Sequence, residues 1–494
     1  HLQQMADSGQ HDPGESSRQS KNPQTTSHSS LRGRLQLGTR RKWRKLIHAA
    51  EDNKTLNPGT YGSRPGRTAT DPVLIEELQA EINRLSRKSQ IKFANDASSC
   101  YDRIIPGLAN LASRKFGMNK QVCMVQGRTL EHAKYQLKTL LGISTEQYSH
   151  CTFHPIYGTG QGSGSSPGIW LVICSTLFDC HEHLSQGALY ESPDRTESIR
   201  IFMIGFVDDS AGQINDFDSI HPHTPTELIA TMQKDAQIWS DLLHSTGGAL
   251  EMPKCTYHVT YIDFTMTGAP CFRGGTIGPP LTLHNGARTA TQTITAYNSY
   301  KGYKTLGCWK EPQGNQRAQY HASKTKSDEY SRMIQSSTCT WTDAWTFYFA
   351  IYLTSVGYPL PTCHFSEKDL GEIQKKAVNS IISKCGFCSK TARDIVYGTP
   401  KYGGMGFRHL YTEQSIGQIQ LFLKHWRTPG QPGTLLRIAV AWNQMAVGTE
   451  QPTLTDTTAA LPHYESNWLA APCCLYLGHI NAPLTLHKSG PTPR

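Results

Sequence analysis

The chain has 494 residues, and its 49 Lys and Arg outnumber its 39 Asp and Glu to give a formal net charge of +10. The length suggests about three domains, and a basic excess suits a polyanionic partner where it clusters. No secretory signal and no apolar run of about 20 residues is present, so the sequence predicts no membrane association and favours an intracellular protein, nuclear or cytoplasmic.

The N-terminal residues 1–30 are rich in Ser, Gln, His, Asn and Gly and show no apolar period, which predicts disorder. They begin with His1 instead of Met, so the chain looks like a fragment. The cluster of positive charge follows, from Arg32 to Lys45, with seven cations, no acid and Trp43. Either it contacts a nucleic-acid backbone while Trp43 stacks on a base, or it is a solvated or disordered arm. Residues 1–45 are predicted to form a disordered, basic N-terminal segment.

An amphipathic helix is predicted over residues 71–86, with Asp71 as its N-cap and Pro72 at its first position. Its apolar residues recur at three- and four-residue spacing. They are Leu74, Ile75, Leu78, Ile82 and Leu85.

Two predicted strands end in carboxylates. The first is Phe93–Asp96, and the second is the apolar run Ile201–Val207, which leads into a hairpin tip at Asp208 and Asp209. An Asp pair also suits a tight turn for local reasons. Two such strand ends, however, can place Asp96 and Asp208 side by side. Carboxylate oxygens are the ligands that Mg²⁺ prefers, and a pair of divalent ions is what phosphoryl transfer requires.

Two more helices are predicted around these strands. The Gly- and Ser-rich segment Gly160–Pro167 opens an apolar helix, so its amides would lie at a helix N-terminus where anions bind well; an ordinary linker is the alternative. Thr224–Glu227 is a capping box for a second helix, which stops near Gly247. The apolar residues of the two helices are Ile169, Trp170, Ile173, Leu177, Leu228, Met232, Ala236, Trp239 and Leu243.

The C-terminal part reads as mostly helical over residues 325–428, with one helix at about 366–384 and a turn-rich connector at Tyr397–Gly406. Beyond residue 446 the periodicity fades. The 14 cysteines are scattered, which favours reduced thiols. Cys385 and Cys388 form the one CxxC pair, for which zinc is a weaker interpretation. Isolated histidines such as His154 and His258 are expected to be structural or surface residues.

In chain order, these and neighbouring segments resemble the motifs of reverse transcriptases, most closely those of non-long-terminal-repeat retroelements (retrotransposons) and group II introns. The resemblance covers residues 57 to about 310 and continues more loosely to about 428. The matching segments are Tyr61–Asp71, Asp96–Arg103, Gly160–Pro167, Phe206–Asp209, Thr246–Leu250 with Lys254–Cys255, and Tyr303–Trp309.

This resemblance implies an α+β right-hand polymerase: an antiparallel palm sheet with helices, partial fingers and a helical thumb. The domains would be fingers and palm over residues 46–310, a thumb-like region over 311–445 and a low-complexity tail over 446–494. A Rossmann sheet is not predicted, because no GxGxxG follows a first strand. The implied function is RNA-directed DNA polymerase, a nucleotidyltransferase that extends a DNA primer on an RNA template with deoxynucleoside triphosphates and two Mg²⁺ ions, or Mn²⁺.

The resemblance also implies catalytic residues. Asp96 and Asp208 would ligate both ions, with Asp209 as an auxiliary carboxylate and metal ligand, while Asp102 would be structural. Lys254 would give a proton or positive charge to the leaving pyrophosphate.

Residues that bind substrate are implied in the same way. Tyr101 lies five residues after Asp96, where the family places an aromatic ring under the incoming sugar. Gln161 and Gly162 would border the nucleotide. Arg64 and Arg67 would touch the template or the triphosphate, and salt bridges at a helix cap explain them almost as well.

Two alternatives stay open. An RNA-dependent RNA polymerase would usually have a small or polar residue in place of Tyr101, and a decayed retroelement remnant would bind nucleic acid without catalysis. The resemblance further implies a basic strand pair before Tyr61, where this chain has the N-terminal segment. Truncated fingers of this kind predict a weak polymerase or an inactive one.

Overall fold

A computed structural model of the chain describes residues 33–140, 142–151, 157–160, 163–216, 223–448 and 467–469. The predicted disorder of residues 1–30, and almost all of the tail, lie outside the described residues. None of the helices in these ranges is both long and apolar enough to cross a membrane.

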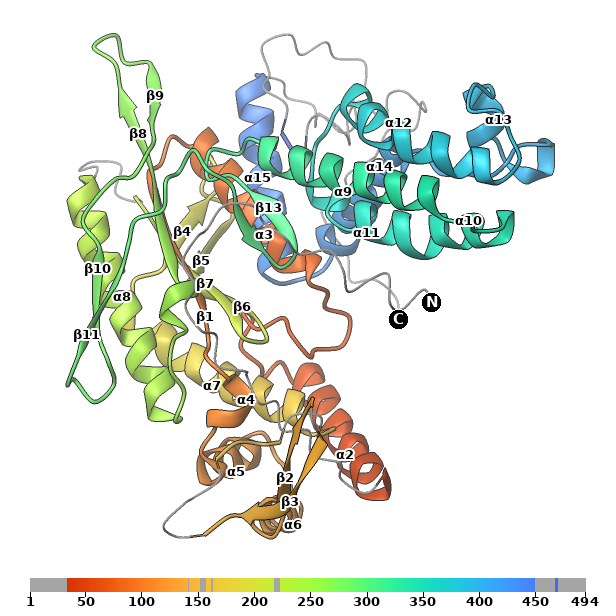
Figure 1. Cartoon of the computed structure of the whole chain (residues 1–494). Coiled ribbons are helices and arrows are strands. Elements are labelled where there is room, and N and C mark those ends of the chain that lie inside the picture. The colour runs from red at the N-terminus through yellow and green to blue at the C-terminus, as the bar shows by residue number, and fades with distance from the viewer. Residues whose placement is uncertain are drawn as a thin grey trace.

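The centre of the protein is a five-stranded sheet in which every neighbouring pair is antiparallel (Figure 1). The mixed helix and sheet composition and the antiparallel pairing agree with the predicted α+β class. The apolar run predicted as one strand is split at Phe202 into β5 and β6. In spatial order the sheet contains β6 (Met203–Phe206), β7 (Asp209–Asn215), β1 (Gln90–Asp96), β8 (Thr256–Phe264) and β9 (Pro270–Arg273).

Two helices pack on one side of this sheet, α7 (Ser166–Leu184) and α8 (Pro225–Ser245). Both were predicted, and α8 begins with the expected capping box at Thr224. Successive strand residues face opposite sides, so β1 buries Ile91 and Phe93 in the core with these helices. Its other face presents Lys92, Ala94 and Asp96 to the opposite side of the sheet.

Helices and a hairpin form the part of the molecule at the bottom of Figure 1. Helix α2 is amphipathic, with Trp43, Leu46 and Ala50 buried, so the described part of the basic cluster is a helix and not the disordered arm that was expected. The elements here are α2 (Gly33–Asp52), α4 (Cys100–Arg103), α5 (Pro106–Lys115), α6 (Lys120–Glu131), β2 (Lys134–Thr139) and β3 (Gly142–Ser149).

Three further hairpins surround the sheet. The hairpin β12–β13 occupies the segment Tyr303–Trp309 that resembles a primer grip. The short strands are β4 (Ala188–Glu191) with β5 (Ser198–Ile201), β10 (Leu281–His284) with β11 (Thr291–Ile294), and β12 (Tyr303–Thr305) with β13 (Cys308–Lys310).

The C-terminal region is helical, as predicted, and has its own apolar core. The helix expected at 366–384 is α12, and it starts with a capping box at Ser366. The elements are α9 (Arg317–Ser336), α10 (Trp341–Phe347), the π-helix η2 (Tyr348–Tyr352), α11 (Leu353–Gly357), η3 (Leu360–Thr362), α12 (Glu367–Lys384), α13 (Arg393–Tyr397), η4 (Pro400–Tyr402), α14 (Leu410–Trp426) and α15 (Gln431–Val447).

Helix α3 (Thr70–Leu85) joins the two halves of the molecule, because α14 and α15 return to share a core with it. Asp71 is not the N-cap that was predicted. The N-cap is Ala69, and the Asp71 carboxylate instead accepts hydrogen bonds from Lys424 at 2.7 Å and His425 at 2.9 Å. Burial opposes ionisation, but these bonds outweigh it and lower the pKa of Asp71 to about 2.

Glu81 on the same helix gives the first prediction. It is 2% exposed, its Oε1 accepts a hydrogen bond from Asn443 at 2.8 Å, and its Oε2 has no partner among the described residues. Burial raises its pKa from 4.5 to about 7. Because the folded-state pKa is raised, ionising Glu81 costs the folded state stability as pH rises above 4.5, and the full cost of about 3 kcal/mol applies above pH 7.

Glu81→Gln should therefore raise the free energy of unfolding at pH 8 and have little effect at about pH 4. Urea denaturation at the two pH values measures this. Glu329→Gln, at an exposed position in α9, is the matched control. An equal gain at both pH values would show that ionisation of Glu81 is not the cause.

Candidate active site

The three predicted catalytic carboxylates lie at one end of the sheet. Asp96, the last residue of β1, is the register partner of Asp209, the first residue of β7. The backbone N–H of Ala97 donates to the carbonyl of Asp208 at 3.1 Å. The turn of the hairpin therefore lies directly beside the end of β1, as the sequence predicted.

The turn itself is strained. Val207 has a φ of +63°, which is unfavourable for a β-branched residue. The indole N–H of Trp170 on α7 donates to the Val207 carbonyl at 2.5 Å, and Tyr61 N–H donates to the Gly205 carbonyl at 2.8 Å. A Cβ on Gly62 would meet the Val207 nitrogen at 2.5 Å, so only glycine fits there. Two distant segments thus fix the direction of the Asp208–Asp209 turn.

Negative charge is crowded at this turn. Partial desolvation in the cleft, followed by the charges of Asp208 and Asp96, raises the pKa of Asp209 to about 6. Lys254 lies on the short helix η1 (Met252–Lys254), and its Nζ is 2.5 Å from Asp96 Oδ2. The hydrogen bond and charge of Asp96 raise the pKa of Lys254. The charge of Lys254 thus offsets part of the carboxylate charge.

The donor chemistry and the strand positions fit a magnesium site, since hard carboxylate oxygens stand at adjacent strand ends and a divalent ion would relieve their repulsion. The side chains do not yet form a ligand set. Across the described ranges, no three His, Cys, Asp or Glu side chains lie close enough together to hold one metal ion. Asp96 accepts a hydrogen bond from Lys254. Its carboxylate would have to exchange this partner for a cation that it shares with Asp208 and Asp209.

Cys385 and Cys388 belong to no metal-binding group among the described residues, and every described cysteine is a free thiol. His258 is buried, as a structural histidine would be, while His154 lies outside the described residues.

Tyr101 follows β1 on the short helix α4 and is half-buried. Burial, then Cys100 and the charge of Asp208, raise the pKa of Tyr101 to about 12, so its ring lies within electrostatic reach of the carboxylates. Thr159 N–H donates to the Tyr101 carbonyl at 2.8 Å, which docks the start of the Gly- and Ser-rich segment against α4. Gln161 and Gly162 lie outside the described residues, so their expected contact with a nucleotide stays a prediction.

Arg64 and Arg67 form salt bridges, which was the alternative to a substrate-binding role. The Arg64 guanidinium is 2.7 Å from Glu51 and donates to the carbonyls of Asn57 and Thr60 at 2.8 and 2.9 Å. Its side chain is only 5% exposed, so no edge is available to a triphosphate. Arg67 lies 3.8 Å from the same glutamate and over the ring of Tyr61.

Trp43 is also not a base-stacking residue. It is 2% exposed, it packs where a Cβ on Gly168 of α7 would clash with its ring at 2.6 Å, and its N–H donates to Gln126 at 3.3 Å. The basic residues around it remain at the surface. Those with exposed side chains are Arg40, Arg41, Lys42, Arg44 and Lys45, which we call the α2 basic face.

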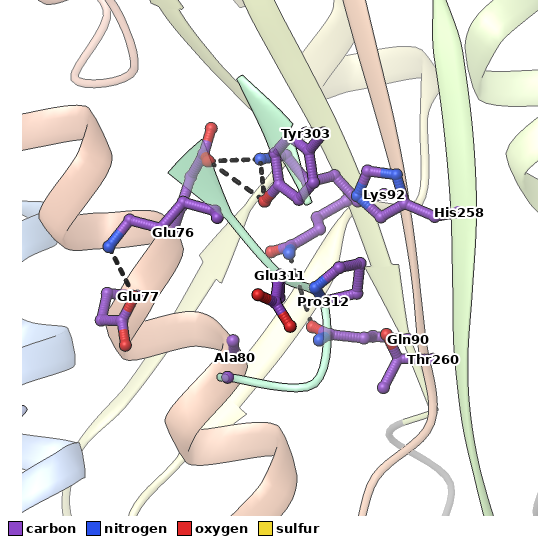
Figure 2. Close-up of a pocket in the computed structure, with 13 residues that line it drawn as sticks. Glu76, Glu77, Ala80, Gln90, Lys92, His258, Thr260, Tyr303, Glu311 and Pro312 are labelled. Carbon is purple, nitrogen blue, oxygen red and sulfur yellow. Dashed lines mark hydrogen bonds and ion pairs between the residues drawn. The ribbon is translucent and has the colours of Figure 1, made fainter. Parts of the chain in front are cut away.

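A cleft of about 330 Å³ separates the carboxylates from the hairpin β12–β13. Under the hairpin lies a buried charged cluster that the sequence did not predict, made of Glu76, Glu77, Lys92 and Lys310. Figure 2 shows Glu76, Glu77 and Lys92 of this cluster. Lys92, which stands between the apolar residues Ile91 and Phe93 of β1, was the available signal. The residues lining the cleft include Pro72, Glu76, Asp96, Phe206, Asp209, Lys254, Tyr303, Lys304, Thr305, Leu306 and Gly307.

The chain was compared with known proteins. No protein-family model and no curated protein matches it. Among solved structures it is similar to telomerase from Candida albicans in complex with the TWJ fragment of telomeric RNA, with a TM-score of 0.36 and 12% identity, covering 85% of this chain and 55% of that one. It is also similar to apo telomerase from Candida tropicalis, with a TM-score of 0.34 and 11% identity, covering 81% of this chain and 60% of that one. The chain thus spans 55% and 60% of the length of these two telomerase chains, which is less than two thirds.

Proposed function

We propose that this chain is a template-directed nucleotidyltransferase that extends a DNA primer on an RNA template by two-metal phosphoryl transfer. The observation that supports this most is the register of the sheet, which sets Asp96 opposite Asp209 with Asp208 at the adjoining turn. A cleft of about 330 Å³ is lined by Asp96 and Asp209. We also propose that the chain derives from a retroelement, and this part of the proposal depends on the sequence motifs alone.

In this proposal Asp96, Asp208 and Asp209 would hold Mg²⁺, which when bound would activate the 3′ oxygen and neutralise the leaving pyrophosphate. The chain's own residues orient the substrates. Lys254 is 66% exposed at its side chain and reaches Asp96 from the edge of the cleft, so it is free to move to a phosphate. Tyr101 would lie beneath the incoming sugar.

Primer extension tests the proposal. The purified chain is given an RNA template, a DNA primer, Mg²⁺ and either deoxyribonucleotides or ribonucleotides. Template-dependent addition of deoxyribonucleotides is expected. Ribonucleotide addition alone would identify an RNA polymerase. Binding without extension would favour the second candidate, a nucleic-acid-binding remnant, for which the Lys254–Asp96 ion pair is the supporting observation.

Tyr101 provides a prediction about the sugar. Replacing it with Ala removes the half-buried ring beside Asp208 and opens space for a 2′-hydroxyl. We expect the ratio of ribonucleotide to deoxyribonucleotide kcat/KM to rise by roughly tenfold or more, since a steric exclusion of this kind is worth about 1–3 kcal/mol. Single-nucleotide extension with matched dNTP and rNTP measures the ratio. An unchanged ratio would remove Tyr101 from sugar discrimination.

The α2 basic face supplies a second prediction, about the template. No ion pair joins its five cations to another described residue, and Trp43 anchors the helix to α7 directly after the Gly- and Ser-rich segment. Changing Arg40, Arg41, Lys42 and Arg44 to Gln should therefore weaken RNA binding. The slope of log K against log salt should become less steep by about 3, because each phosphate that the variant no longer neutralises accounts for about 0.7 to 0.9 of the slope.

The matched control replaces four exposed lysines of the C-terminal region, Lys368, Lys375, Lys390 and Lys401, with Gln. It makes the same change in net charge. Equal slopes for the two variants would mean that the α2 basic face acts only through overall charge.

A further inference from the structure

A cavity of about 660 Å³ lies between α12, α13 and the start of α14, in the helical C-terminal region and apart from the central sheet (Figure 1). Its described lining residues all differ from those of the cleft at the carboxylates. Its volume is typical of cavities that hold small organic ligands, and it is far larger than one water molecule needs. The chemistry of its walls therefore indicates which ligand fits.

Gly371 opens the wall that α12 contributes to this cavity. It lies in the interior of the helix, where glycine is less stable than alanine. A Cβ at this position would have no neighbouring atom within 4 Å, so close packing does not require a glycine. The missing side chain leaves the cavity open down to the helix backbone, where a ligand can approach closely.

Hydrogen-bond donors line the buried side of the cavity. Gln374 is 2% exposed and accepts from Leu410 N–H at 3.1 Å through Oε1, while its Nε2 donates to no described residue. Arg393 donates through Nη2 to the side-chain oxygen of Asn379, and its Nη1 is buried without a partner among the described residues. Leaving a buried donor without an acceptor is costly. An oxyanion in the cavity would give both side chains an acceptor.

The start of α14 adds to these donors and supplies an aromatic wall. The N-cap residue His409 makes no capping bond through its side chain, and Thr412 N–H, in the first turn, donates to no described residue. The N-terminus of a helix is partially positive and attracts anions. His409 packs edge-on against Tyr397, with ring centroids 5.0 Å apart. Burial lowers the pKa of His409, so this wall is uncharged at neutral pH.

The remaining charged residues restrict the size of the anion. Glu367, Lys375 and Asp394 line the cavity and are exposed, so they lie at its mouth. Two carboxylates beside one lysine repel a polyphosphate or a nucleic-acid backbone that passes between them. A single phosphate bound deeper in the cavity, at Arg393 and Gln374, avoids most of this repulsion. The volume that remains beside it is too large for inorganic phosphate alone and has the aromatic wall along one side.

We propose that this cavity binds a nucleoside monophosphate. The phosphate accepts hydrogen bonds from Arg393, from Nε2 of Gln374 and from the backbone of Thr412, and the base lies against the rings of Tyr397 and His409. This site is separate from the carboxylates, and its occupancy does not depend on the proposed polymerase activity.

Isothermal titration calorimetry of the full chain, without metal or nucleic acid, tests the ligand. The probes are the four ribonucleoside 5′-monophosphates, the parent nucleosides, the triphosphates and inorganic phosphate. At least one monophosphate should bind, and its nucleoside, its triphosphate and inorganic phosphate should each bind roughly tenfold more weakly or worse, since each lacks a contact or adds repelled charge. No monophosphate binding at about 1 mM, or tighter binding of the triphosphate, would overturn the inference.

Two variants test the location. Gly371→Leu fills the cavity and should abolish binding without lowering the thermal midpoint, because leucine is favoured over glycine in a helix interior. Arg393→Gln should weaken binding roughly tenfold or more. Lys368→Gln, an exposed position on α12 outside the cavity, makes the same change in charge and should keep the wild-type affinity. Binding that survives Gly371→Leu, or that an excess of primer–template displaces, would place the nucleotide elsewhere and refute the assignment of this cavity.

Discussion

Asp208→Asn should lower kcat by roughly 10³-fold or more in primer extension while the chain stays folded. The variant keeps the size and the turn geometry of Asp208 but removes a charged oxygen at the place where a cation would bind. Asp208 is exposed at the hairpin tip, and no hydrogen bond or ion pair ties its carboxylate to another described residue. The fold therefore does not depend on its charge, and the thermal midpoint should be nearly unchanged.

Asp102→Asn is the matched control for this prediction. It makes the same chemical change on α4, six residues after Asp96, at a position for which we expect a structural role. Rates are measured in Mg²⁺ at saturating primer–template, and binding is measured separately without metal. If Asp208→Asn polymerises at the wild-type rate, or if Asp102→Asn loses as much activity, the assignment of the carboxylates as metal ligands is wrong.

Local sequence signals predicted most of the elements that position the site. The capping box at Thr224 and the spacing of apolar residues after it correctly predicted α8. The apolar run that ends at Asp96 correctly predicted β1. The sequence also suggested that Asp96 and Asp208 could lie side by side. They lie at one edge of the sheet because β1 and β6 run in the same direction on either side of β7, which is antiparallel to both.

The misassigned residues have long-range partners. Asp71 is a residue type that often caps a helix N-terminus, but its carboxylate is bound by Lys424 and His425, which lie more than 350 positions away in the sequence. Trp43 stands among cations, yet its spacing with Leu46 and Ala50 is that of a buried helix face. The partners of Glu76 and Glu77 could not be found from α3 alone, since they lie in β1 and β13.

The pair formed by Glu77 and Lys310 leads to the largest expected loss of stability. Lys310 Nζ lies 2.6 Å from Glu77 Oε2 and donates to the carbonyl of Thr362 at 2.8 Å. The two side chains are 10% and 8% exposed. Burial disfavours the charged form of both groups, but the attraction between the two charges outweighs the effect of burial. The pKa of Glu77 is therefore lowered and that of Lys310 is raised. Both groups are therefore ionised at neutral pH.

Lys310→Met should lower the free energy of unfolding by about 3–5 kcal/mol at pH 7, because it leaves the Glu77 charge buried without its partner. The double variant Lys310→Met with Glu77→Gln should recover much of this loss, since no uncompensated charge remains. Lys376→Met is the control: its ion pair with Asp328, at 3.3 Å, has a lysine side chain that is 65% exposed, so the expected cost is under about 1 kcal/mol. Urea denaturation measures all three.

The pH dependence of stability distinguishes a buried unpaired charge from lost packing as the cause of the destabilisation. In the wild type the pKa of Glu77 is lowered in the folded state, so its stabilising contribution is complete above pH 4.5 and is lost as pH falls through the folded-state value. In Lys310→Met the same carboxylate loses its closest cation and keeps only the more distant His364, at 3.9 Å, and Arg84, so its pKa should instead rise. Acidification from pH 7 toward pH 5 should then narrow the gap between the variant and the wild type. A gap that stays constant over this range would mean that lost packing of the lysine stem, and not a stranded charge, accounts for the destabilisation.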